Sequence, residues 1–201
     1  MVNIKFLKKE FTKYKNERKR KVALGDDVLY QMCKDYPNHD KYAWVKAKVG
    51  IIGRAYQTFI ERLIKISHKG KKLNAMDQLV AFVISHHVTI DREIKNIRKL
   101  EKQKGKDSQK VLIEIVKSHE ILVRLFKQLL RNHHSATSFL SKYLHFHSRI
   151  VPVFDGKTSR NIRKIIKRKD ILKLDEKFKD GDPNYADYVK RLIVFFKSLK
   201  N

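Results

Sequence analysis

The sequence predicts an all-α protein, a compact bundle of many helices. Apolar residues recur every three to four positions through most of the chain, which is the period of an amphipathic helix. Three prolines and seven glycines in 201 residues are too few turn signals for a many-stranded β fold. The 42% of hydrophobic residues exclude a disordered basic tail. We expect one domain over 1–201, in which 1–105 and 106–201 are candidate interlocked subdomains with a cleft between them.

The first half of the chain contains five predicted helices. The first is a basic amphipathic segment, and the second follows a stop and cap at Gly25 and Asp26. The third is the most hydrophobic and is predicted as one helix, although Gly50 and Gly53 lie inside it. Each glycine costs about 1 kcal/mol relative to alanine, so we expect a close packing partner there. Asn74 is predicted to cap the fourth. The predicted ranges are 6–22, 26–35, 40–67, 75–85 and 89–103.

The second half begins with an apolar helix and becomes very basic toward its end. A polar connector at 132–138 separates the apolar helix from a short one. A Pro-containing apolar run, 150–154, then predicts extended, buried chain, and it leads into a cationic helix. A turn at 180–183 precedes a last amphipathic helix that ends near residue 199. The predicted helical ranges before this turn are 109–131, 139–147 and 157–169.

The charge of the chain indicates a polyanionic partner. Lys and Arg number 47 against 21 Asp and Glu, a formal net charge of +26. Positive residues recur in several segments, so nucleic acid is the expected partner, DNA before RNA, with a steep salt dependence. An AT-rich genome that places lysine on protein surfaces is the alternative explanation. The predicted nucleic-acid-binding residues are Lys157, Arg160, Arg163, Lys164, Lys167 and Arg168.

Several classes of protein are not expected. The sequence has no apolar run of membrane-spanning length and no secretion signal, so we expect an intracellular, cytoplasmic protein, nucleoid-associated if bacterial. A single cysteine, Cys33, excludes an internal disulfide. The sequence contains no glycine-rich phosphate loop, so no nucleotide cofactor is expected. His145 and His147 lie two positions apart on a predicted helix and are a poor chelate, so no metal is expected.

Two charged residues are the candidate catalytic groups. Lys142 lies on a short helix with an aromatic face, and Asp155 ends the apolar run at the start of the cationic helix. The helix N-terminus and nearby cations favour an ionised carboxylate at this position. Alternatively, Asp155 is an ordinary helix N-cap, and a residue can be both an N-cap and a catalytic group. The alternative for Lys142 is a salt bridge with Asp155.

Five further residues are candidates for the wall of a pocket. Arg54 and Glu61 are charged residues on a helix predicted to be largely buried, so they are expected to pair or to line a cavity. Tyr56 is an aromatic residue that either stacks on an extruded base or belongs to the core. His145 and His147 follow Lys142 on its helix.

The order of these features resembles a known superfamily. A helix with Lys142, a connector, the segment Pro152-Val153-Phe154-Asp155 and a basic helix are similar to the end of the helix-hairpin-helix DNA glycosylases, especially their 8-oxoguanine-glycosylase-like relatives. The match covers about 109–170. The resemblance implies base flipping, stabilisation of the sugar cation or orientation of water by Asp155, and attack on the sugar by Lys142. It thus implies an N-glycosylase, with or without lyase activity.

Two other functions remain open at the level of sequence. The first is a non-catalytic DNA- or RNA-binding module, for which the charge alone is sufficient. The second is a helical ribonuclease of the HEPN type, because Arg62 and His68 have the loose spacing of that motif.

Overall fold

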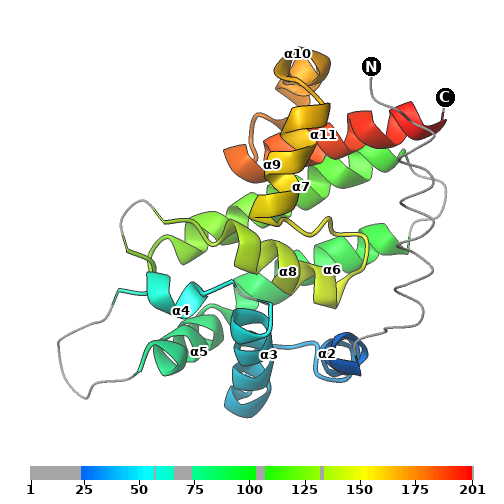
Figure 1. Cartoon of the computed structure of the whole chain (residues 1–201). Helices are drawn as coiled ribbons and strands as arrows, with labels where there is room; N and C mark the ends of the chain where they lie inside the picture. Colours follow the sequence, from blue (N-terminus) through cyan, green and yellow to red (C-terminus); the bar gives the residue numbers. More distant parts are fainter. Residues whose placement is uncertain (1–23, 57, 66–73, 103–106, 132–133, 201) are drawn as a thin grey trace.

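The computed structural model describes residues 24–56, 58–65, 74–102, 107–131 and 134–200 (Figure 1). Within these ranges the chain is all-α, as predicted, and contains no strand. The predicted helix at 6–22 lies outside the described residues. The helices are α2 (Leu24–Asp35), α3 (Tyr42–Arg54), α4 (Ile60–Leu63), α5 (Ala75–Ser85), α6 (His87–Glu101), α7 (Ser108–Phe126), α8 (Thr137–His147), α9 (Gly156–Ile165), α10 (Arg168–Ile171) and α11 (Pro183–Lys200), with 3₁₀ turns η1 (Leu172–Leu174) and η2 (Glu176–Phe178).

Helix α8 lies at the centre of the fold. It packs against α7, α2, α3 and α6, and Figure 1 shows it between the α9–α11 group and the α2–α5 group. Most of its side chains are buried, among them Phe139, Leu140, Tyr143 and Leu144. A helix that is apolar around most of its circumference belongs in a core. The buried amine of Lys142 on this helix therefore needs a specific explanation.

The predicted helix over 40–67 is two helices with a break between them. Helix α3 ends at Arg54, where the Thr58 hydroxyl donates to the carbonyls of Ile52 and Gly53 at 3.3 and 3.4 Å. Phe59 then has a left-handed backbone conformation, with φ of 50°, before α4 begins. The apolar period continues through the break because α4 also faces the core, so the pattern by itself did not reveal the break.

Two other predicted helices are shorter than expected. Helix α7 ends at Phe126, and the chain beyond it pairs with the chain after α4 through an isolated bridge between Ile64 and Leu130. The basic helix predicted at 157–169 ends at Ile165, because Ile166 is extended and its carbonyl accepts from the buried Arg191 guanidinium. Beyond α7 a long-range backbone hydrogen bond replaces the next helical one, and beyond α9 a long-range bond from the Arg191 side chain does so.

The expected close packing at the two glycines of α3 is not found. A Cβ atom at Gly50 would meet only the Met76 methyl, at 3.9 Å, and one at Gly53 would lie 3.5 Å from Ile60. These are ordinary van der Waals distances. Of the four glycines whose surroundings are described, the tight one is Gly181, before α11, where a Cβ would come within 2.2 Å of Val116 on α7.

We therefore expect opposite effects from two glycine substitutions. Gly181→Ala should lower the free energy of unfolding by about 1–3 kcal/mol, because Val116 is a stiff, buried side chain. Gly50→Ala should raise it by about 0.4–1 kcal/mol, since alanine restricts the unfolded chain and fits the helix. Urea unfolding curves of the two variants measure both effects. Equal midpoints would contradict the packing at Gly181.

Candidate functional site

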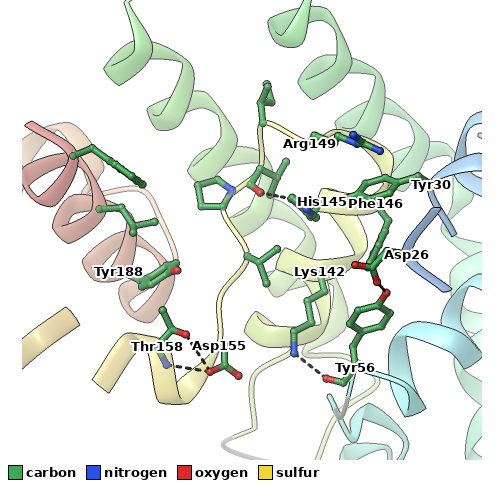
Figure 2. Close-up of a pocket in the computed structure, with 16 residues that line it drawn as sticks. Asp26, Tyr30, Tyr56, Lys142, His145, Phe146, Arg149, Asp155, Thr158 and Tyr188 are labelled. Atoms are coloured by element: carbon green, nitrogen blue, oxygen red, sulfur yellow. Dashed lines mark hydrogen bonds between the residues drawn. The ribbon is translucent and has the colours of Figure 1, made fainter. Parts of the chain in front are cut away.

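The residues after α8 are held along this helix by two of its serines. The Ser141 hydroxyl accepts from the Phe154 amide at 3.0 Å, and the Ser138 hydroxyl donates to the Phe154 carbonyl at 3.3 Å. Tyr185 of α11 donates to the Pro152 carbonyl at 2.7 Å. Because Phe154 is fixed beside Ser141, the next residue of each segment, Asp155 and Lys142, faces the same space. Figure 2 shows both side chains there.

That space is a cavity of about 540 Å³, here named the Lys142–Asp155 cavity. Its lining comes from α2, the chain after α3, α8, the 149–155 segment, α9 and α11. The lining residues are Asp26, Tyr30, Tyr56, Lys142, His145, Phe146, Arg149, Ile150, Val151, Pro152, Val153, Asp155, Thr158, Tyr188, Leu192 and Phe196. The wall thus combines aromatic and aliphatic side chains with six polar or charged ones, and such convergent polar groups in an apolar pocket are usual for a small-molecule site.

Lys142 is 8% exposed and donates to the backbone carbonyl of Tyr56 at 2.9 Å (Figure 2). It forms no direct ion pair with Asp155, so the salt-bridge alternative is wrong. Burial lowers the pKa of the amine, and the Asp155 carboxylate opposes this effect. The Tyr56 carbonyl is available because α3 has ended; in a continuous helix the amide of residue 60 would occupy it.

Asp155 is the N-cap of α9, as predicted. One of its carboxylate oxygens accepts from the amides of Lys157 and Thr158 at 2.9 and 3.0 Å. The Thr158 amide lowers the pKa of the carboxyl most, and Lys157 and Lys142 lower it further. The carboxylate is therefore held ionised and in a fixed orientation at the wall of the cavity.

A second group of polar residues lies across the cavity from Asp155. The Tyr30 hydroxyl lies 2.6 Å from His145 Nε2, and His145 Nδ1 lies 2.7 Å from the Val151 carbonyl oxygen. The Arg149 guanidinium stacks over the Tyr30 ring at 4.2 Å and is 67% exposed at the rim. The Tyr56 hydroxyl donates to Asp26. Figure 2 shows Tyr30, His145 and Arg149 together on one side and Tyr188 on the other.

Three of the five predicted wall residues lie outside the lining of this cavity. Arg54, the last residue of α3, is 73% exposed and pairs with Glu61 of α4 at 3.2 Å, which is the first of the two alternatives predicted for these residues. His147 is two positions beyond His145, so it points to another side of α8, where it is buried against His39 and Tyr143. Neither ring nitrogen of His147 has a hydrogen-bond partner, and burial lowers its pKa strongly. Only Tyr56 and His145 line the cavity.

The sequence pattern did not indicate that the wall of the cavity includes Tyr30, Arg149, Thr158 and Tyr188. Tyr30 and His145 are separated by 115 positions, and only the packing of α2 on α8 brings them together. Burial, followed by the Asp155 carboxylate, raises the pKa of Tyr188 to about 12, which keeps its hydroxyl neutral. Thr158 was recognisable only as the residue three positions after the cap.

The predicted nucleic-acid-binding residues extend away from the cavity along α9 and α10. All six are exposed, but Arg163 pairs with Asp187 at 3.0 Å and Arg168 with Asp175 at 2.9 Å. Within the described part of the chain, the others make no ion pair. Lys157, Arg160 and Lys164 lie on one face of α9, opposite the buried Ser159 and Ile162, and this face begins beside Asp155. We name it the α9 basic face.

Arg62, the described residue of the candidate ribonuclease motif, does not support the ribonuclease alternative. Arg62 stacks over the Phe59 ring at 4.6 Å and does not line the cavity, and His68 lies outside the described residues. Among the described residues, no group of three or more His, Cys, Asp and Glu side chains is arranged to hold a metal ion. None of the described helices has the length and apolar character needed to cross a membrane.

Comparisons of the chain with protein-family models, with curated proteins and with solved structures give no match. The site therefore has to be interpreted from its own chemistry. Its two distinctive groups are a buried amine of lowered pKa and an ionised, capped carboxylate in one aromatic cavity.

Proposed function

We propose that this protein binds nucleic acid, DNA before RNA, takes an extruded base into the Lys142–Asp155 cavity and cleaves the N-glycosidic bond. The observation that carries the proposal is the convergence of Lys142 and Asp155 on one aromatic cavity. The resemblance to helix-hairpin-helix glycosylases suggests the same pair of residues.

The size and the wall of the cavity suit a single base. Its volume of about 540 Å³ falls within the range of roughly 300–1,000 Å³ found for small-molecule sites. Tyr56, Phe146 and Tyr188 offer aromatic rings to a base that has left its stack. An enzyme that reacts at the sugar of one nucleotide needs such a pocket, because the bond is inaccessible within a stacked duplex.

Asp155 would act on the sugar. As the base departs with the electron pair of the N-glycosidic bond, positive charge develops on the sugar ring. A carboxylate that the α9 amides hold ionised and fixed can stabilise this charge and accept a proton from the attacking water.

Lys142 would provide a second route. In its neutral form the amine can attack the sugar C1′ carbon and displace the base, and opening of the sugar ring then gives an imine between Lys142 and C1′. The lowered pKa of this amine makes its neutral form more accessible than that of an ordinary surface lysine. Borohydride reduces such an imine to a stable covalent adduct.

Base release is the direct test. Duplexes that carry uracil, hypoxanthine, 8-oxoguanine or an alkylated purine are incubated with the protein, and abasic sites are counted after alkaline cleavage. We expect release from at least one duplex and, if the lysine is the nucleophile, a borohydride adduct that Lys142→Gln abolishes. Normal duplex binding without release of any base would favour a non-catalytic module, which the cationic α9 supports independently.

The α9 basic face gives a separate prediction for binding. Lys157→Gln and Lys164→Gln should each weaken duplex binding and reduce the slope of log K against log salt by about one. Lys46→Gln is the matched control, because it removes the same charge from α3, where Lys46 pairs with Asp77 at 2.9 Å. Titrations at several salt concentrations measure the slopes. An equal change in the control would mean that net charge, not this face, governs binding.

A further inference from the structure

One hydrogen-bonded chain in the cavity has no role in the chemistry described above. It runs from the Tyr30 hydroxyl to His145 Nε2 at 2.6 Å, and from His145 Nδ1 to the Val151 carbonyl at 2.7 Å. Tyr30 is half-buried, and both Tyr30 and His145 line the cavity, with Lys142 and Asp155 elsewhere on the same wall. Figure 2 shows the imidazole between the α8 backbone and the 149–152 segment.

The Val151 carbonyl fixes the protonation pattern of the imidazole. A carbonyl oxygen only accepts, so His145 Nδ1 must carry a proton. In the neutral ring, Nε2 then accepts from the Tyr30 hydroxyl. In the protonated ring, Nε2 donates to the Tyr30 oxygen, and the hydroxyl proton is directed away from the ring. The pair can thus hold one more proton and present it at the tyrosine oxygen.

Charged groups face this pair from several elements. The Arg149 guanidinium lies over the Tyr30 ring, where it would stabilise negative charge as the tyrosine loses its proton. Asp26 of α2, Lys142 of α8 and Asp155 of α9 also line the cavity that this pair faces. Among the described residues, Tyr56 and Tyr188 also present titratable hydroxyls to the cavity.

We propose that Tyr30 protonates the departing base and that His145 replaces its proton. This inference rests on the proposed glycosylase function and deepens it. The Tyr30 O–H bond breaks as an N–H bond forms on the base, which leaves as a neutral molecule with the electrons of the glycosidic bond. The His145 Nε2–H bond breaks as the tyrosine O–H bond forms again, and the imidazole ends neutral. The substrate class is a neutral base, whose departure as an anion is slow without a proton.

The prediction separates bases that need a proton from bases that do not. Two duplexes of one sequence carry hypoxanthine, which is a neutral base, or 7-methylguanine, which already bears a positive charge and leaves as a neutral molecule. Tyr30→Phe keeps the ring under Arg149 and removes only the hydroxyl. It should slow the single-turnover release of hypoxanthine by about 10²–10⁴-fold and that of 7-methylguanine less than about threefold.

His145→Gln should show the same split. Because the reaction needs a proton from this pair, we expect the wild-type release of hypoxanthine to slow at high pH, and this slowing should be absent from both variants. Tyr42→Phe, which removes a tyrosine hydroxyl bonded to Asp77 outside the cavity, should change neither rate. Thermal unfolding and binding of a duplex with an abasic-site analogue check that both variants fold and bind.

The outcomes distinguish the two proposals. Three results would overturn the proton-transfer role and leave the glycosylase proposal standing. The variants release both bases equally slowly, they release neither base more slowly than the wild type, or the wild type releases only 7-methylguanine. If the wild type releases only hypoxanthine, the proton-transfer role is also overturned when Tyr30→Phe has an unchanged rate of hypoxanthine release or an unchanged pH profile. If the wild type releases no base from any duplex, the glycosylase proposal fails, and this inference fails with it.

Discussion

Asp155→Asn is expected to abolish base release almost completely while the protein stays folded. The asparagine oxygen can still accept from the amides of Lys157 and Thr158, and asparagine is as good an N-cap as aspartate. What the variant loses is the negative charge that would stabilise the sugar cation and take a proton from water. We expect the single-turnover rate to fall by about 10²–10⁴-fold. The thermal midpoint and duplex affinity should change little.

Asp107→Asn is the matched control for this variant. Asp107 caps α7 in the same way, accepting from the Gln109 amide at 2.9 Å, but does not line the Lys142–Asp155 cavity. This substitution should leave the rate unchanged. Full activity of Asp155→Asn would reduce Asp155 to a helix cap and remove its proposed role in catalysis.

The pH dependence of the reaction provides a further check on Asp155. Its pKa is held below the ordinary 3.8 by the α9 amides and the nearby Lys142, so the carboxylate is already ionised at every pH above its usual range. Any pH dependence of the rate between about pH 5 and 9 must therefore come from other groups in the cavity. An acid limb in this interval that disappears in Asp155→Asn would contradict the assignment.

Lys48→Met is expected to have the largest effect on stability. Lys48 on α3 is fully buried, and its amine donates to the carbonyls of Tyr36 and Asn38 at 2.9 and 3.1 Å and lies 3.2 Å from His39 Nε2. His39 in turn contacts Asp91 of α6. Methionine fills a similar volume but leaves these buried acceptors without a donor. We expect the free energy of unfolding to fall by about 3 kcal/mol.

Lys46→Met, two positions earlier on α3, is the control for this substitution. Lys46 is exposed, and its surface pair with Asp77 should contribute little to the free energy of unfolding. Denaturant unfolding of both variants gives the comparison. Equal stability of Lys48→Met and the wild type would mean that removing the buried charge fully offsets the lost hydrogen bonds.

The sign of the pH effect at Lys48 is defined by its pKa. Burial lowers the pKa of Lys48 from 10.5 to about 8, so between these values the unfolded chain holds a proton that the folded protein has released. The free energy of unfolding should therefore rise with pH over this range, by up to about 3 kcal/mol. Burial raises the pKa of Cys33 from 9.0 to about 11, which has the opposite effect above pH 9.

The difference between the wild type and Lys48→Met reports the lysine together with its coupling to Cys33, because the Lys48 charge lowers the pKa of the Cys33 thiol. We expect this difference to grow as the pH is raised from 8 to 10.5. A constant difference across this range would contradict the lowered pKa of the buried Lys48 amine.

The parts of the site that the sequence predicted well depend on local interactions. The Asp155 cap joins residues two and three positions apart, and the Asn74 cap accepts from the Asp77 amide in the same way. The buried face of α8 likewise follows from the spacing of its apolar residues. By contrast, the period did not locate the break after Arg54, because α4 continues the same apolar pattern. That break leaves the Tyr56 carbonyl available to Lys142.

By itself, the sequence determined the all-α class, the excess of positive charge and the helix start at Asp155. These properties depend on composition and on contacts within one or two helical turns. The tertiary structure decided which side chains share a cavity. It placed Tyr30 against His145 and Arg149 over Tyr30, and it turned His147 into the core. The physical reason is that helix packing, and not spacing along the chain, determines which faces of distant helices meet.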